Sequence, residues 1–292
     1  MVLLWRRWLQ RWQAPSYARR SPVVLINGLA EQAETWFFNV AAWRRDFDVY
    51  LPNLVTYEGP ALHRRIAAGL PISIDYLVEQ MRTYLADYVQ RPPYHLVANS
   101  MGGKVAVEFA VRYPEQVSRL VLLCPSGLAD QETLPIVEGV RRSDMQAVVD
   151  SVFYDARCVP AELGEYYKQQ VKSRRWRTGL LRTVRGTMGH RVRSLLPQVR
   201  QPTLLVVGRD DRIVNPQEAV EAARLLPRGQ LVVLPRCGHA PQIEAADTIN
   251  RLASRFLNEG SLVTPAPGFH EIWPAKQRLR TPRAAHALDT SA

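Results

Sequence analysis

The stretch that indicates the fold is YHLVANSMGGKVAVEFA, residues 94–110. A short apolar run there meets a segment with helical apolar periodicity, and Ser100 stands at the junction. A serine in a sharp strand-to-helix turn has a strained backbone and lifts its hydroxyl above the edge of the sheet. Ala98 and Gly102 are small, as the close approach of strand and helix requires. The pattern predicts a nucleophilic serine, and the alternative is an ordinary helix cap formed by Asn99 and Ser100.

A reactive serine needs a base, and the base needs an orienting acid. His239 follows an apolar strand at 230–234 and a short turn, which would place it at the carboxyl end of a parallel sheet. Asp211 follows the preceding strand, 203–207, and we choose it as the acid over Asp210, which we expect to cap the next helix. The order Ser, Asp, His along the chain is the order expected for this strand–turn–helix architecture.

Residues 22–258 resemble the α/β-hydrolase superfamily in several ordered motifs. These are Asn27-Gly28, NSMGG at 99–103, GRDDR at 208–212 and CGH at 237–239. The last three are also similar to the carbon–carbon bond hydrolases that cleave meta-ring-fission products. The resemblance implies an α/β fold with a mostly parallel sheet, helices on both faces and a helical cap insertion. It also implies a catalytic triad of Ser100, Asp211 and His239.

The loop after the first core strand departs from the family pattern. It reads Asn27-Gly28-Leu29-Ala30, where the family usually has His-Gly. The resemblance implies that the backbone N–H groups of Leu29 and Met101 form the oxyanion hole. The carbon–carbon hydrolases carry a glycine-rich loop here and tend to have tryptophan where this chain has Ala240. The substrate of that subfamily therefore does not transfer directly to this chain.

The length of 292 residues and an apolar content of 47% suit one domain with an insertion. Strands and helical patterns alternate, which predicts a parallel sheet. The expected strands are 23–26, 47–51, 94–98, 117–123, 203–207 and 230–234. We expect the hydrolase core at 21–127 and 197–258, the cap at 128–196 and a disordered, Pro-rich tail at 259–292.

Helical patterns fill the range expected as the cap. Ser143 to Gln146 form a capping-box start, and further helices are expected at 160–175 and 177–194. Such a cap covers the catalytic edge, excludes water and shapes the substrate pocket. The alternative is a helical dimerisation surface, and the sequence predicts no particular oligomeric state.

Positive charge is concentrated in one segment. The formal net charge is +11, and residues 166–209 contain eleven Lys or Arg and no Asp or Glu. A solvated helix face is the simplest explanation, but the complete lack of acids favours an anionic small-molecule substrate or an anionic lipid surface. Nucleic acid is not expected as a partner, because no recognised binding motif is present.

The N-terminal residues 1–20 are basic and amphipathic. Within residues 1–12, tryptophans and leucines fall on one helical face and arginines on the other. This pattern predicts a helix that lies on an anionic membrane surface, and docking on the protein body is the alternative. The apolar run is too short for a transmembrane span or a secretory signal.

The three cysteines, Cys124, Cys158 and Cys237, do not form a disulfide pattern. We therefore expect a cytoplasmic protein, with peripheral membrane attachment through residues 1–12 as an addition. Cys237 lies near His239, but no further ligands are spaced for a metal, so we assign it to packing. No metal and no cofactor are expected.

Three functions follow from these observations. The first is a serine hydrolase of an ester, thioester or lactone. The second is a carbon–carbon bond hydrolase of an acidic diketone-like substrate, whose carboxylate the basic cap would bind. The third is a non-catalytic, membrane-associated scaffold, suggested by Asn27 and by the loss of the usual D-x-x-G segment after the second strand.

Overall fold

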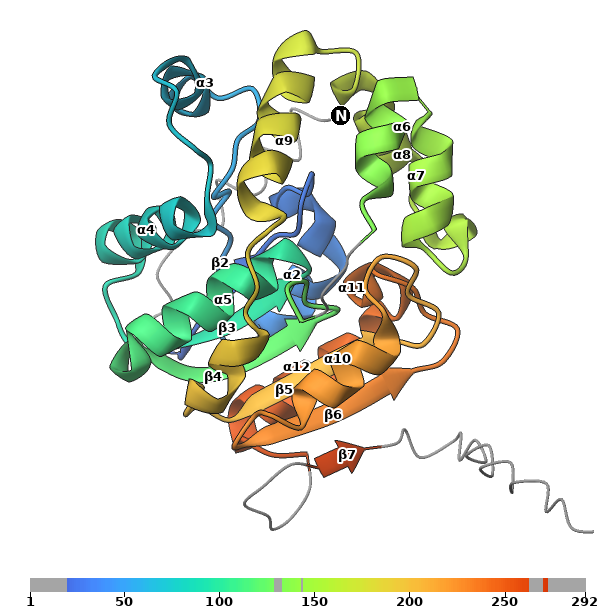
Figure 1. Ribbon diagram of the computed structural model, residues 1–292. Coiled ribbons are helices and arrows are strands. Elements are labelled where there is room, and N and C mark those ends of the chain that lie inside the picture. The colour runs from blue at the N-terminus through green and yellow to red at the C-terminus, as the bar shows by residue number, and fades with distance from the viewer. Residues whose placement is uncertain (1–19, 129–132, 143, 263–269, 273–292) are drawn as a thin grey trace, which may run out of the picture.

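A computed structural model describes residues 20–128, 133–142, 144–262 and 270–272. In this part of the chain, seven parallel strands form one sheet in the order β2-β1-β3-β4-β5-β6-β7 (Figure 1). The strands are β1 (Pro22–Ile26), β2 (Asp48–Tyr50), β3 (Tyr94–Asn99), β4 (Val117–Leu123), β5 (Thr203–Gly208), β6 (Gly229–Leu234) and β7 (His270–Ile272). Their parallel direction brings all carboxyl ends to one edge of the sheet.

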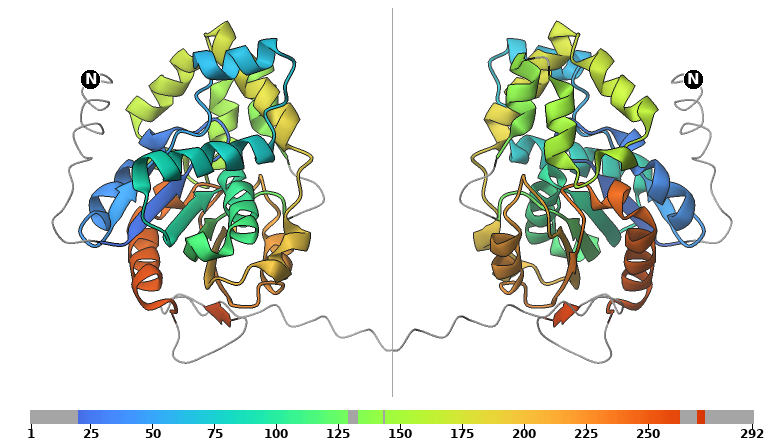
Figure 2. Two further views of the ribbon diagram at one scale, coloured as in Figure 1. Left: turned by 90° about the vertical axis from the view of Figure 1, so that its left-hand side faces the viewer. Right: turned by 90° about the vertical axis from the view of Figure 1, so that its right-hand side faces the viewer.

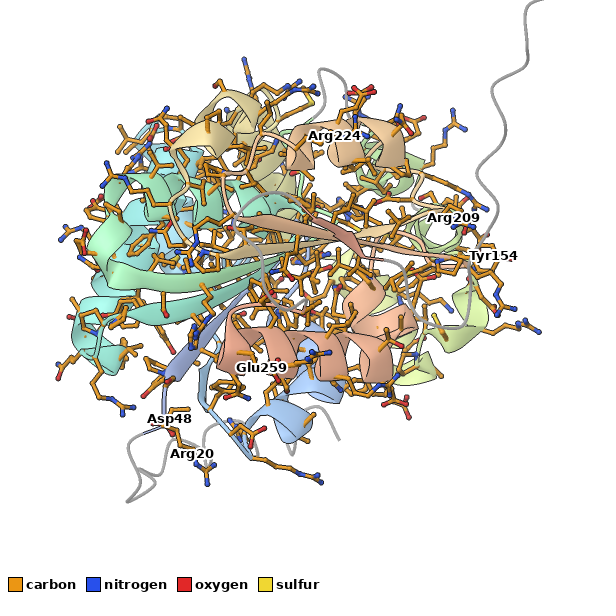
Figure 3. The ribbon with its side chains drawn as sticks, turned by 90° about the horizontal axis from the view of Figure 1, so that it is seen from below. Arg20, Asp48, Tyr154, Arg209, Arg224 and Glu259 are labelled. Carbon is orange, nitrogen blue, oxygen red and sulfur yellow. The ribbon has the colours of Figure 1, made fainter. Side chains whose placement is uncertain are left out.

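Apolar side chains of successive strand residues point to opposite faces of this sheet, and each face has its own core. Leu96 and Leu205 belong to one core, and Val97 and Val206 to the other. The first face is covered by α4 (Ile74–Tyr84), α5 (Met101–Arg112) and α10 (Pro216–Ala223), and the second by α2 (Phe37–Trp43) and α12 (Ala246–Glu259). Figure 3 shows Arg224 and Glu259, at the ends of α10 and α12, on opposite sides of the strands.

A second group of helices lies on one side of this core (Figures 1 and 2). The group consists of α3 (Pro60–Ala67), α6 (Pro135–Arg142), α7 (Met145–Val152), α8 (Ala161–Gln170) and α9 (Arg174–Thr187). The remaining elements are α11 (Pro241–Glu244) and the short turns η1 (Ala33–Trp36), η2 (Leu85–Val89), η3 (Pro114–Gln116), η4 (Ala156–Cys158) and η5 (Arg193–Gln198). None of the described helices is both long and apolar enough to cross a bilayer.

The helices in the range 128–196 begin at other residues than the sequence predicted. Asp144, and not the expected Ser143, caps α7, because its side chain accepts a hydrogen bond from the N–H of Ala147. Ser143 lies outside the described residues. We expected two helices at 160–175 and 177–194, but α8 ends at Gln170 and α9 begins at Arg174. Ser173 is the N-cap of α9, because its side chain accepts a hydrogen bond from the N–H of Trp176.

The six expected strands are present within one or two residues of their predicted ends. Strand β7 was not predicted, and it corrects the expectation of disorder at residues 259–292 for this short segment. It pairs with the edge strand β6 through backbone groups, which need no strong side-chain pattern. The expected N-terminal helix and most of the C-terminal tail lie outside the described residues.

At the start of α5, the helix backbone lies so close to the end of β1 that no side chain fits between them. A Cβ atom on Gly102 would lie 2.5 Å from the carbonyl oxygen of Ile26 and 2.7 Å from that of Asn27. Gly164 in α8 has no atom within 4 Å of the corresponding position. Gly102 therefore allows helix and strand to meet.

We predict that Gly102→Ala lowers the free energy of unfolding by about 1–3 kcal/mol, because the backbone must move apart. Gly164→Ala is the matched control and should raise that free energy by up to about 1 kcal/mol through helix propensity. Urea unfolding followed by circular dichroism measures both. Equal effects of the two substitutions would contradict the proposed close contact.

Candidate active site

Ser100 occupies the turn between β3 and α5 in a conformation that non-glycine residues rarely adopt. Its φ is 52° and its ψ is −119°. The turn is held by its backbone: the Ser100 N–H donates to the carbonyl of Leu123 at 3.0 Å, and the Ser100 carbonyl accepts from the N–H groups of Gly103 and Ser126 at 2.9 and 3.1 Å. The end of β4, the loop after it and the first turn of α5 thus keep the serine in its strained geometry.

The structure brings Ser100, His239 and Asp211 together in one hydrogen-bonded chain. Nε2 of His239 lies 2.7 Å from Oγ of Ser100, and Nδ1 lies 2.8 Å from Oδ2 of Asp211. All three residues are buried. A serine, a base and an acid at these distances can transfer a proton from the hydroxyl to the imidazole.

Asp211 is held as an anion that faces the imidazole. Its second oxygen, Oδ1, accepts from the N–H groups of Ile213 and Val214 at 2.8 and 3.0 Å. Burial raises the pKa of the Asp211 carboxyl, but the charge and hydrogen bond of His239 and the two backbone donors outweigh burial and leave the pKa below its usual value. The carboxylate can therefore orient His239 and stabilise its protonated form.

Asp210, the other candidate acid, takes no part in this chain of hydrogen bonds among the described residues. Its backbone N–H donates to the carbonyl of Cys237 at 3.0 Å. That contact joins the end of β5 to the loop that carries His239. Asn215, rather than Asp210, caps the following helix α10, because its side chain accepts from the N–H of Gln217.

The residue before the nucleophile connects the serine turn to the histidine loop. Asn99 is fully buried, and its Nδ2 donates to the carbonyls of Leu123 and His239 at 3.1 and 3.2 Å. It therefore fixes the backbone of His239 relative to β3 and β4. Sequence reasoning missed this role, although its position directly before Ser100 was a signal that could have been followed.

The histidine loop is also attached to the end of α7. The N–H of His239 donates to the carbonyl of Val152 at 2.8 Å. Glu244 accepts from the N–H of Gly238 at 2.9 Å with one carboxyl oxygen and from the N–H of Tyr154 at 2.7 Å with the other. Residues 152–154 and the base of the triad therefore share one set of hydrogen bonds.

A buried thiol lies beneath the acid and the base. Sγ of Cys124 and ligand atoms of Asp211 and His239 lie within 4.8 Å of one another. The thiol accepts from the N–H of Gly208 at 3.4 Å, and burial raises its pKa well above the usual value. Its neutral state and enclosed position are typical of packing, and the sequence did not indicate that Cys124 lies here.

The two residues predicted to form the oxyanion hole lie next to the nucleophile. Met101 is the first residue of α5, so its N–H has no acceptor within the helix and lies at the positive end of the helix dipole. A Cβ atom on Gly28, the residue before Leu29, would lie 3.1 Å from Cβ of Ser100. The loop that contains Leu29 thus passes directly beside the serine.

Asn27 replaces the usual histidine but still anchors this loop. Its Oδ1 accepts from Nε1 of Trp36 at 3.0 Å, and its Nδ2 donates to Oδ1 of Asn53 at 3.3 Å. Asn53 also accepts from the N–H of Ala33 at 2.9 Å. The side-chain amide therefore joins the loop both to η1 and to the segment after β2.

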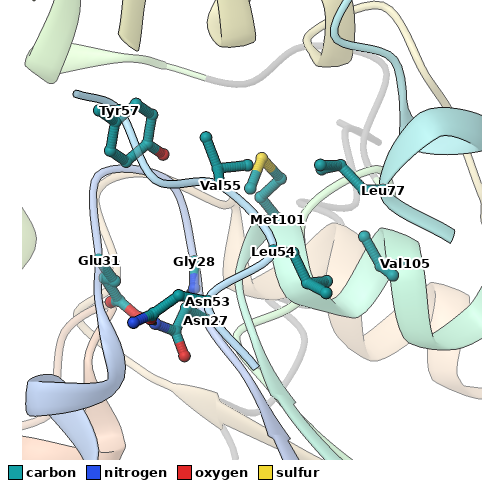
Figure 4. Close-up of a pocket in the computed structure, with 10 residues that line it drawn as sticks. All are labelled: Asn27, Gly28, Glu31, Asn53, Leu54, Val55, Tyr57, Leu77, Met101 and Val105. Carbon is teal, nitrogen blue, oxygen red and sulfur yellow. Dashed lines mark hydrogen bonds between the residues drawn. The ribbon is translucent and has the colours of Figure 1, made fainter. Parts of the chain in front are cut away.

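A pocket opens beside the loop and the start of α5 (Figure 4). Its polar side consists of Asn27, Gly28, Glu31 and Asn53, and its apolar side includes Leu54, Leu77, Met101 and Val105. Val55 and Tyr57 complete the lining. Because Gly28 and Met101 adjoin Ser100, this pocket lies beside the nucleophile.

The sequence pattern of the alpha/beta hydrolase fold family matches residues 21–246, which is most of the chain. The chain belongs to this family. Both the recognition of the α/β-hydrolase superfamily and the fold class predicted from the motifs are thereby confirmed.

Relatives in the α/β-hydrolase family carry out several reactions. The chain is 30% identical, over 81% of its length and 89% of the relative, to a 2-hydroxy-6-oxo-2,4-heptadienoate hydrolase from Pseudomonas putida. It is 24% identical to Lipase 1 from Psychrobacter immobilis over 77% of this chain and 73% of that protein. A meta-cleavage product hydrolase from Pseudomonas fluorescens has a similar structure, with a TM-score of 0.69, 24% identity and coverage of 84% and 93%. These likenesses place the chain among hydrolases without selecting a substrate.

The choice between the two adjacent aspartates is open to a direct test. We predict that Asp211→Asn lowers kcat by about 10⁴-fold, because the imidazole loses its orienting anion. Asp210→Asn, the matched control, should change kcat by less than about threefold. Steady-state kinetics with an activated ester measures both, and a large loss in the Asp210 variant alone would reverse the assignment.

Proposed function

We propose that this protein is a serine hydrolase that cleaves a carboxylic ester, thioester or lactone through an acyl-enzyme. The observation that carries the proposal is the unbroken hydrogen-bonded chain from Ser100 Oγ through His239 to Asp211. Its enclosed position and the strained serine turn add support. The intact chain also favours an enzyme over a non-catalytic scaffold.

In the proposed mechanism, Oγ of Ser100 attacks the substrate carbonyl while Nε2 of His239 takes its proton. Asp211 stabilises the imidazolium that forms. The backbone N–H groups of Leu29 and Met101 would stabilise the negative oxygen of the tetrahedral intermediate. His239 then returns the proton to the leaving group, and a water molecule activated by the same imidazole releases the acyl group.

The pocket favours a neutral, apolar acyl group. Its apolar side is formed by aliphatic side chains and Met101, and none of the ten lining residues is Lys or Arg. The ionisable side chains in the lining are those of Glu31 and Tyr57. A substrate carboxylate in this pocket would lack a positive partner, which is costly in a site with little water.

Carbon–carbon bond hydrolysis is the second candidate, and the 30% identity to a dienoate hydrolase favours it. That reaction would require a cation near the acidic substrate. Arg174, Arg175, Arg182 and Arg185 on α9 are exposed to solvent and do not line the pocket. Steering of an anionic substrate by this helix remains a prediction, as does membrane attachment through residues 1–12, which lie outside the described residues.

Labelling with a fluorophosphonate tests the nucleophile. We expect wild-type protein to be labelled at Ser100, as shown by peptide mass spectrometry, and Ser100→Ala and His239→Ala to remain unlabelled. Both variants should lower kcat by about 10⁴- to 10⁶-fold. Folded wild-type protein that is neither labelled nor active on esters would refute the proposal and support the scaffold.

Two nearly isosteric esters test the acyl pocket. We expect kcat/KM for 4-nitrophenyl 4-methylpentanoate to exceed that for 4-nitrophenyl hemisuccinate by at least about 10-fold, because the buried carboxylate has no counter-charge. A meta-ring-fission product, followed by loss of its absorbance, is the third substrate. Faster turnover of this acid than of both esters would replace the ester proposal by carbon–carbon bond hydrolysis.

A further inference from the structure

Two hydrogen bonds hold the loop beside the nucleophile, one on each side of Leu29. The N–H of Gly28 donates to Oε2 of Glu31 at 2.9 Å. The N–H of Ala30 donates to the hydroxyl oxygen of Tyr57 at 2.8 Å. Within the described part of the chain, the N–H of Leu29 between them has no hydrogen-bond partner. The N–H groups of Gly28 and Ala30 thus bind side chains, while the N–H of Leu29 between them is the one expected to bind the oxyanion.

The loop needs this support because its backbone is strained. Ala30 has a φ of 63°, a left-handed conformation that favours glycine. An alanine adopts this conformation less readily than a glycine, so the contacts of the loop must hold it there. The hydrogen bond from Ala30 to Tyr57 stabilises it at the residue where the strain occurs.

Tyr57 is itself fixed by its surroundings. It is 1% exposed, and its ring lies edge-on to that of Trp176 in α9, with 5.7 Å between ring centroids. Its carbonyl oxygen lies 2.9 Å from Nε2 of His63. Burial raises the pKa of the phenol, so the hydroxyl stays protonated and can accept from Ala30 while keeping its own proton.

Glu31 is a carboxyl group placed close to the reacting atoms. It lines the pocket (Figure 4), and Nε2 of Gln242 lies 3.4 Å from its Oε1. Burial raises its pKa, against the opposing effects of the Gly28 N–H, the charge of His239 and the hydroxyl of Thr35. The carboxyl thus accepts from the loop through Oε2 and from Gln242 through Oε1, which fixes it beside Gly28.

We propose that Glu31 and Tyr57 are positioning residues of the oxyanion hole: they bind the N–H groups on both sides of Leu29 and so leave the Leu29 N–H to the substrate oxygen. This inference rests on the proposed hydrolase function. It assigns to the two side chains the task of holding the loop so that a single backbone donor faces the nucleophile.

Three variants test the proposal. Tyr57→Phe removes the acceptor for Ala30, and Glu31→Ala removes the acceptor for Gly28. Each should lower kcat by about 10- to 100-fold with KM changed less than about threefold, because a misplaced donor acts mainly on the transition state. Glu31→Gln keeps an oxygen that accepts from Gly28 and should stay within about threefold of wild type.

A transition-state analogue separates positioning from general damage. The inhibition constant of a trifluoromethyl ketone should rise in parallel with the loss of kcat/KM, while the affinity for the product acid stays constant. Tyr113→Phe and Glu79→Ala are the matched controls, because Tyr113 donates to Glu79 at 3.1 Å on the outer side of α4 and α5. Thermal unfolding of every variant monitors the fold.

The results distinguish two kinds of failure. If wild-type protein hydrolyses esters and Ser100→Ala does not, the proposed function stands. Unchanged kcat in Tyr57→Phe and Glu31→Ala would then overturn the positioning role, as would a Glu31→Gln variant as weak as Glu31→Ala. If wild-type protein hydrolyses no ester and takes no label, the proposed function fails and the positioning role falls with it.

Discussion

The backbone of Ser100 must keep a positive φ at the point where β3, β1 and α5 meet, and much of the molecule serves this requirement. A turn this sharp requires Gly102 opposite the carbonyl of Ile26. It also requires an acceptor at the end of β4, the carbonyl of Leu123, and a donor just after that strand, the N–H of Ser126. The two apolar cores pack helices against both faces of the sheet, and their cooperative stability keeps the serine in a conformation that an isolated peptide would leave.

The sequence was sufficient for the features that depend on local pattern. The strands have simple apolar runs, and Ser100, Asp211 and His239 each follow a strand at the same sheet edge, so their convergence could be inferred from topology. The contacts of Glu31 and Tyr57 with the loop could not be inferred in this way. Tyr57 lies 27 residues from Ala30 in a segment without regular structure, and no periodic pattern marks such a pairing.

Other misses have similar physical reasons. Cys124 was considered only in terms of disulfides, but its position at the end of β4 places it under the triad. The start of α9 depends on a single capping side chain, that of Ser173. Several arginines follow this serine, so the sequence around it shows no clear apolar pattern that marks a new helix. The positive charge of residues 166–209 could be read from the sequence, but its position relative to the pocket could not: Arg174, Arg175, Arg182 and Arg185 are exposed, and the pocket lining contains no Lys or Arg.

The attachment of the histidine loop to residues 152–154 has a consequence for protein engineering. Enzymes with a separate lid are often redesigned by exchanging the lid between homologues. In this protein the carbonyl of Val152 and the N–H of Tyr154 are part of the support for His239, so a chimera joined after α7 would also exchange the support of the base. Recombination that retains residues 152–154 together with Glu244 would keep the hydrogen bonds that hold the histidine loop.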